Sequence, residues 1–208
     1  SSMRNYLNNT TVNFRLENDL NFSDITIDVS EIDGFEDYND NGWLPIGPSS
    51  SASFRGKFDG QGYTIYDLYI NRPNSNFVGL FGYGDLSTLR ISNINLSSAN
   101  VTGLDDVGSL IGLLNNGVVT NVTTEANVSG TNYVGGLIGE QTSSSQTSYS
   151  SSSGFVQGAG YTGGLVGSNN WGTLLYNFSS ADVFCSGCSY GGGGLVGYTN
   201  GPIRYSYA

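Results

Sequence analysis

A stretch of eight residues in the middle of the chain alternates strictly between two kinds of side chain. The first set is Val122, Thr124, Ala126 and Val128, and the second is Thr123, Glu125, Asn127 and Ser129. A period of two is that of a β-strand with one face toward a core and the other toward solvent. The pattern therefore predicts a half-buried strand over residues 122–129.

The pattern returns at a nearly constant interval, since Val101, Val128, Val156 and Val183 follow one another at almost equal spacing. An independent column consists of glycine-hydrophobic-glycine segments such as 135–139, whose closing glycines keep almost the same spacing. These closing glycines are Gly82, Gly112, Gly139, Gly167 and Gly197. Two columns with one spacing predict a structural repeat of about 28 residues.

Such a repeat cannot bury its apolar row alone. Stacked at about 4.8 Å per rung, its short strands pair with the coils above and below and enclose a continuous core. The sequence therefore predicts an all-β parallel β-helix (β-solenoid). Residues 1–76 are expected to form lead-in or capping strands and the first coils, and residues 77–208 the repeat coils of the same solenoid.

The repeated glycines are expected to serve two purposes at a corner of each coil. Glycine adopts positive φ without strain, and it lets neighbouring coils approach closely. Two irregularities stand out: Ser109 takes the place of a repeat glycine, and the serine-rich segment 143–153 predicts an irregular strand.

The repeats resemble the GLUG motif, a glycine-leucine-hydrophobic-glycine repeat of secreted and cell-surface proteins of bacteria and archaea. Segments 14–20, 43–47 and 54–65 resemble the lead-in of such arrays. Adhesins and the non-catalytic regions of some immunoglobulin A proteases carry this motif. The resemblance implies a right-handed parallel β-helix in an extracellular protein, and it implies no catalytic residues.

Charge and composition exclude several classes of function. The net charge of −10 disfavours nucleic acid, whose binding depends on lysine and arginine. No run of 18 apolar residues occurs, so no membrane insertion is expected. The chain has no histidine, which excludes histidine-dependent nucleophiles and imidazole zinc sites.

One acidic segment resembles the start of a calcium loop. Asp37, Asn39 and Asn41 offer oxygen ligands on alternate residues, followed by Gly42. The twelfth position of such a loop would be Pro48 rather than a bidentate glutamate, and a solvated acidic loop is the alternative. Apart from this candidate calcium site, no cofactor is expected.

Cys185 and Cys188 are the two cysteines of the chain. Without histidine or further cysteines they make only half of a zinc site, so a local disulfide is expected. It would close a very short loop and therefore stabilise little of the chain.

Eight Asn-x-Ser/Thr sequons are candidate glycosylation sites, although a chain rich in these residues also produces sequons by chance. They are Asn8, Asn9, Asn21, Asn95, Asn100, Asn121, Asn127 and Asn177.

Three tyrosines form a column of their own. Tyr149, Tyr176 and Tyr205 follow one another at close to the spacing of the repeat, which predicts a ladder on one face. The rings either stack in the interior or face outward, where they would offer a platform for sugars.

These observations favour an extracellular, non-catalytic structural or adhesive rod, or a filament or wall subunit. A carbohydrate-binding module that uses the tyrosines is the alternative. A β-helical polysaccharide enzyme would need converging acids near Asp59, Asp67 and Asp85, but Asp59 also fits a turn that caps its own backbone. Since Ala208 falls partway through a coil, we expect head-to-tail self-association or flanking domains of a larger surface protein.

Overall fold

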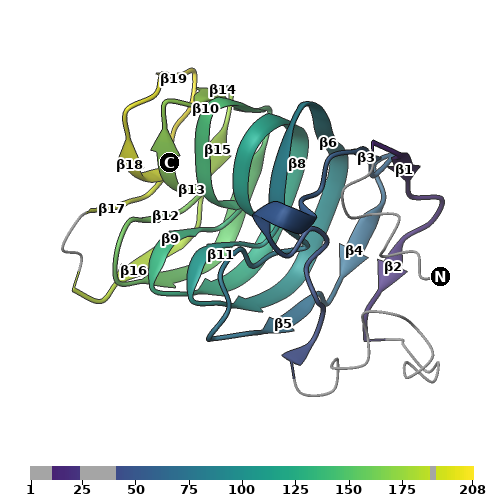
Figure 1. Cartoon of the computed structure of the whole chain (residues 1–208). Coiled ribbons are helices and arrows are strands. Elements are labelled where there is room, and N and C mark those ends of the chain that lie inside the picture. The colour runs from purple at the N-terminus through teal and green to yellow at the C-terminus, as the bar shows by residue number, and fades with distance from the viewer. Residues whose placement is uncertain (1–10, 24–40, 188–190) are drawn as a thin grey trace.

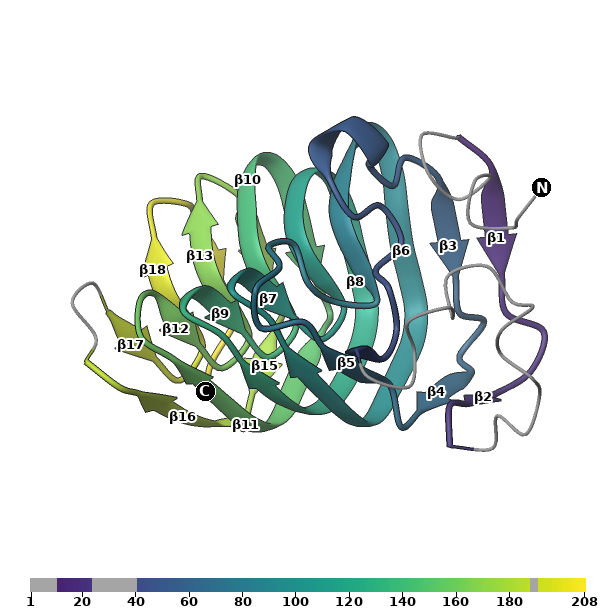
Figure 2. The same ribbon diagram turned by 60° about the horizontal axis from the view of Figure 1, so that its bottom comes forward.

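The computed structural model describes residues 11–23, 41–187 and 191–208, which form strands stacked along one axis (Figure 1). Seven strands follow one another across the main sheet in the order β1-β3-β6-β8-β10-β13-β18, and Figure 2 shows this row along the length of the molecule. These strands are β1 (Asn13–Arg15), β3 (Lys57–Asp59), β6 (Phe81–Thr102), β8 (Ile111–Ser129), β10 (Ile138–Ser148), β13 (Val166–Asn170) and β18 (Val196–Thr199). All pairings along this row are parallel, which confirms the predicted β-solenoid.

The remaining strands complete the coils. Those attached to the main sheet are β2 (Leu20–Asn21), β4 (Thr64–Tyr66), β5 (Tyr69–Asn71), β11 (Ser151–Gly158), β14 (Thr173–Leu175), β15 (Phe178–Ser179), β16 (Asp182–Cys185) and β19 (Ile203–Arg204). A second sheet contains β7 (Asp105–Gly108), β9 (Asn132–Gly135), β12 (Thr162–Gly163) and β17 (Gly192–Gly193). A short 3-10 helix, η2 (Ser50–Ala52), lies in the lead-in segment.

The strand registers reproduce both sequence columns. Val128 pairs with Val101 and with Val156, and Val156 pairs with Val183. The residues that precede the closing glycines also pair, as Ile138 does with Ile111 and Val166. One sequence repeat is therefore one turn of the solenoid.

The alternating segment 122–129 lies in β8 as predicted. Val122, Thr124, Ala126 and Val128 are between 0% and 3% exposed, while Thr123, Glu125 and Asn127 face solvent. At the lead-in end the core is aromatic, because the Phe81 ring lies 4.7 Å from that of Phe54 and 5.3 Å from that of Phe58.

The repeat glycines are required for close approach, and the expectation of positive φ is wrong. None of the closing glycines is in the left-handed region. A Cβ on Gly139 would lie 2.5 Å from the carbonyl oxygen of Gly112, and one on Gly167 would lie 2.6 Å from that of Gly139. Backbone atoms of adjacent coils therefore occupy the space that any other side chain would need.

The interior becomes polar in the later coils. Gln141 and Asn169 are both fully buried, and the Gln141 side-chain amide donates a hydrogen bond of 2.8 Å to the Asn169 side-chain oxygen. The expected irregularity of the serine-rich segment is present as a register shift between Gln141 and Ser144. Ser109, in place of a repeat glycine, is buried and lies 2.9 Å from the hydroxyl of Thr124.

We expect Gly164→Ala to destabilise the solenoid far more than Gly194→Ala, the equivalent change one coil later. The new Cβ would lie 1.9 Å from the carbonyl oxygen of Gly194 in the first variant, whereas in the second the one neighbour among the described residues is the Cβ of Ala208, at 3.0 Å. Overpacking typically costs about 1–3 kcal/mol. Urea unfolding of both variants measures the difference, and equal losses would show that close approach is not the reason for glycine.

Candidate functional sites on the outer surface

Tyr149, Tyr176 and Tyr205 form a stacked ladder on the outside of the solenoid. The ring centroids are 5.0 Å apart for Tyr149 and Tyr176 and 4.8 Å apart for Tyr176 and Tyr205, with interplanar angles of 18° and 11°. The three side chains are 60%, 44% and 72% exposed. Of the two arrangements that the spacing allows, the structure has the outward one.

The direction of these side chains follows from the backbone. Each tyrosine comes directly after a strand, β10, β14 or β19, with φ between 50° and 57°. A residue in this left-handed conformation turns the chain at a corner, and its side chain points away from the core. Because the rings stack on one another, the tyrosine ladder presents mainly ring edges and hydroxyl groups to solvent.

The same corner carries amides in the earlier coils. The Asn121 side chain donates a hydrogen bond of 2.8 Å to Asn93, and Asn93 donates one of 2.9 Å to the carboxylate of Asp59. The hydrogen bond from Asn93, followed by one from the backbone of Gln61, lowers the pKa of Asp59. Asp59 therefore has the turn-capping role that the sequence suggested.

A pair of carboxyl groups, Asp106 and Glu140, lies at another corner. Asp106 is 7% exposed, and burial followed by the charge of Glu140 raises its pKa to about 8. The Asp106 carboxyl donates a hydrogen bond to Glu140, which also accepts one from Ser168. Burial raises the pKa of Glu140 as well. Asp106 therefore keeps its proton near neutral pH, and its Oδ1 has no hydrogen-bond partner among the described residues.

Sequence reasoning missed this carboxyl pair. Gly139 lies against the backbone of Asp106, so the residue after Gly139 meets Asp106 from the next coil. Tyr198 meets Tyr161 in the same way after Gly197, with ring centroids 4.8 Å apart. The repeat length alone does not predict this contact. It becomes predictable once it is known that the residue after a closing glycine lies beside a corner residue of the preceding coil.

The carboxyl pair does not have the geometry of a glycosidase. Such enzymes hold two carboxyl groups at least about 5 Å apart, on opposite sides of the bond to be cleaved. The carboxyl groups of Asp106 and Glu140 are hydrogen-bonded to each other, which leaves no room for a substrate between them.

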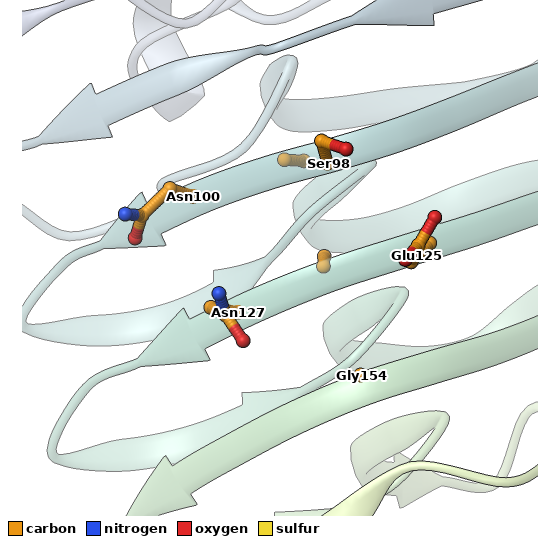
Figure 3. Close-up of a pocket in the computed structure, with 7 residues that line it drawn as sticks. Ser98, Asn100, Glu125, Asn127 and Gly154 are labelled. Carbon is orange, nitrogen blue, oxygen red and sulfur yellow. The ribbon is translucent and has the colours of Figure 1, made fainter.

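A polar groove lies on the face formed by β6, β8 and β11. It has a volume of about 250 Å³, and its floor consists of Ala99, Ala126 and Gly154. Figure 3 shows Ser98 and Asn100 on one strand beside Glu125 and Asn127 on the next. The groove thus crosses three successive coils.

The candidate glycosylation sites have different environments. Asn21, Asn100, Asn121 and Asn127 are exposed, Asn95 is half-buried, and Asn8 and Asn9 lie outside the described residues. Asn177 is 1% exposed, its amide donates to the carbonyl of Thr147, and its oxygen accepts from the backbone of Ser150. A glycan on Asn177 therefore does not fit the folded coil, which corrects the expectation at this position.

Two further predictions fall largely outside the described part of the chain. Asp37 and Asn39 are not among the described residues, so the calcium site stays a prediction, with Asn41 at the edge of the described segment. Cys185 ends β16, but Cys188 lies outside the described residues, and their disulfide also stays a prediction.

Two relatives share part of this sequence. Halomucin of Haloquadratum walsbyi is 39% identical over 113 residues, 53% of this chain and 1% of that protein. A "Putative Gly-rich membrane protein" of Evansella cellulosilytica is 36% identical over 103 residues, 47% of this chain and 12% of that protein. The chain therefore matches only a small part of either relative.

One solved structure has the same fold along nearly the whole chain. It is a "putative immunoglobulin A1 protease" from Bacteroides ovatus, with a TM-score of 0.72 and 18% identity, covering 99% of this chain and 71% of that one. At this identity the likeness shows the fold alone. No protein-family model matches the chain, so membership of the GLUG family stays a prediction. In the described part of the chain, no helix has the length and hydropathy needed to cross a membrane.

We expect the stability of the protein to fall as the pH rises from about 4 to about 8, because of Asp106. Its pKa is about 8 in the folded chain against an ordinary value of 3.8, so within this window the folded state holds a proton that the unfolded state has lost. One such proton changes the free energy of unfolding by about −1.4 kcal/mol per pH unit.

Asp106→Asn should remove the contribution of Asp106 to this slope, leave a smaller one from Glu140, and make the protein more stable than the wild type at pH 8. Glu125→Gln, at an exposed carboxylate, should keep the full slope. Urea unfolding at several pH values measures the effect. A slope as steep in Asp106→Asn as in the wild type would contradict the assignment.

Proposed function

We propose that the chain is a non-catalytic module of a surface protein, which acts as a rigid extracellular rod with adhesive faces. The observation that carries the proposal is the uninterrupted parallel stack from β1 to β18. In such a stack each coil is held by its neighbours through backbone hydrogen bonds, which makes the array stiff and extendable.

Three observations support the proposal. The outer surface of the later coils is polar but carries few charges, since no lysine or arginine lies between Arg90 and Arg204. The carboxyl pair lacks the separation that glycoside cleavage requires. The match to short parts of two much longer proteins suits a module whose coils continue into, or are flanked by, further domains, and head-to-tail association of copies is an alternative way to extend the rod.

The exposed tyrosine ladder favours a second candidate, a carbohydrate-binding module. The rings recur along the axis with their centroids 4.8–5.0 Å apart, so their hydroxyl groups form a row. A row of donors and acceptors at a fixed repeat suits a polymer with regularly spaced hydroxyls better than a single sugar ring, because the facing sides of the three rings are already occupied by stacking.

We expect antibodies against the purified protein to label intact cells of the organism that produces it. Extracellular placement makes the epitopes accessible without permeabilisation, and immunofluorescence with and without detergent measures this. A cytoplasmic protein labelled in parallel is the control. Labelling that requires detergent would contradict a surface role.

The ladder is tested by replacing all three tyrosines with phenylalanine, which keeps the ring stack and removes the hydroxyls. If the hydroxyl row binds polysaccharide, Tyr149→Phe/Tyr176→Phe/Tyr205→Phe should be retained less than the wild type on insoluble cellulose and chitin. The matched control is Tyr133→Phe/Tyr161→Phe/Tyr198→Phe, which removes the hydroxyls from a second column of rings, with centroids 5.6 Å and 4.8 Å apart, at another corner of the coils. Equal retention of both variants would rule out the hydroxyl row as the binding surface.

A further inference from the structure

We propose that the polar groove on β6, β8 and β11 binds a linear, neutral glycan chain. The groove is lined by Ser98, Asn100, Glu125 and Asn127 over the floor of Ala99, Ala126 and Gly154 (Figure 3). The inference rests on the proposed adhesive role and gives that role a site and a class of ligand.

The first argument is the hydrogen bonding of the side-chain amides of Asn100 and Asn127. Asn100 and Asn127 pair in register, are both exposed, and make no side-chain hydrogen bond within the described residues. Two other asparagines on the outer surface differ in their hydrogen bonding, because the side chains of Asn93 and Asn121 donate to neighbouring side chains. The groove therefore holds two adjacent amides, about 4.8 Å apart, whose donors and acceptors are available to a ligand.

The second argument is the position of the carboxylate. Glu125 accepts a hydrogen bond of 3.3 Å from Ser97 through Oε2, which holds it at the edge of the groove. A carboxylate accepts strong hydrogen bonds from hydroxyl groups, and amides both donate and accept. This combination of groups matches the hydroxyls of a pyranose sugar.

The third argument is the shape of the floor and its continuation. Gly154 has φ of +100°, and a Cβ there would lie 2.2 Å from the carbonyl oxygen of Ala126, so only glycine fits at this point of the floor. The next residue, Phe155, is 40% exposed and pairs with Asn127. A ligand that runs along the axis would thus pass from two amides to an aromatic ring, on which a sugar ring can pack.

Volume and charge narrow the class of ligand. A volume of about 250 Å³ lies below the roughly 300–1,000 Å³ of sites that enclose a drug-sized molecule, so the groove contacts one side of a longer chain. The charged side chain in its lining is Glu125, and no lysine or arginine occurs from residue 91 to residue 203. Uronic acids and sulfated sugars would meet a carboxylate without a compensating cation, which favours a neutral glycan.

The test is a titration of the full ¹⁵N-labelled chain, whose mass shows no attached glycan, with hexasaccharides of β-1,4-linked glucose and of β-1,4-linked N-acetylglucosamine. We expect saturable shifts of the side-chain amide signals of Asn100 and Asn127 and of the backbone amides of Gly154 and Phe155. Asn100→Ala/Asn127→Ala should bind at least about tenfold more weakly.

Asn121→Ala is the matched control, since it places the same change on the same strand outside the groove, and its affinity should equal that of the wild type. Urea midpoints show that each variant is folded. The proposal is overturned by the absence of saturable shifts with either neutral hexasaccharide up to about 10 mM, by shifts confined to the tyrosine ladder, or by tighter binding of hexagalacturonate. Surface labelling of cells would be unaffected by any of these results, so failure of the groove and failure of the surface role are distinguishable.

Discussion

Contact between backbones at the glycine corners is the constraint on which the other features depend. Within a coil, a Cβ on Gly163 would lie 2.0 Å from the carbonyl oxygen of Val166, and between coils a Cβ on Gly197 would lie 2.7 Å from that of Gly167. These contacts fix where each coil turns, and they keep the coils close to one length. Constant coil length in turn places equivalent residues of successive coils in register, both in the core and on the surface.

Register explains why the interior can change from apolar to polar without loss of order. Leu114 pairs with Gln141, which pairs with Asn169, so an apolar column continues as a polar one. A buried amide would be costly alone, but in a column each amide meets a partner one rung away. The Gln141 oxygen accepts from Thr147, and the Asn169 amide donates to Thr199.

Much of the fold was predictable from the sequence, because periodicity is a direct consequence of stacking. The alternation over residues 122–129 and the valine column gave the strand, its buried face and the length of a coil. The role of glycine was only half predictable, since close approach depends on backbone atoms of a neighbouring coil. The residues at positive φ include Asn93, Asn121 and Tyr149 instead.

The candidate sites were less predictable than the fold. The regular spacing of Tyr149, Tyr176 and Tyr205 places them in one column, but it does not say which way the side chains point. Asp106 and Glu140 meet through an offset between one corner and the next coil, which the repeat length does not give. Asn177 lies in a glycosylation sequon, yet its side chain is buried and its amide donates a hydrogen bond to the carbonyl of Thr147.

The left-handed corner that bears both the asparagines and the tyrosine ladder has a consequence for how such a protein can evolve. Asn93, Asn121 and Tyr149 have φ of 55°, 55° and 50°, so the same backbone accepts side chains of very different chemistry. Duplication of one coil would therefore add a rung of about 4.8 Å to every surface column at once. Later point mutations at the corner would then alter what the surface recognises, without any change to the packing beneath it.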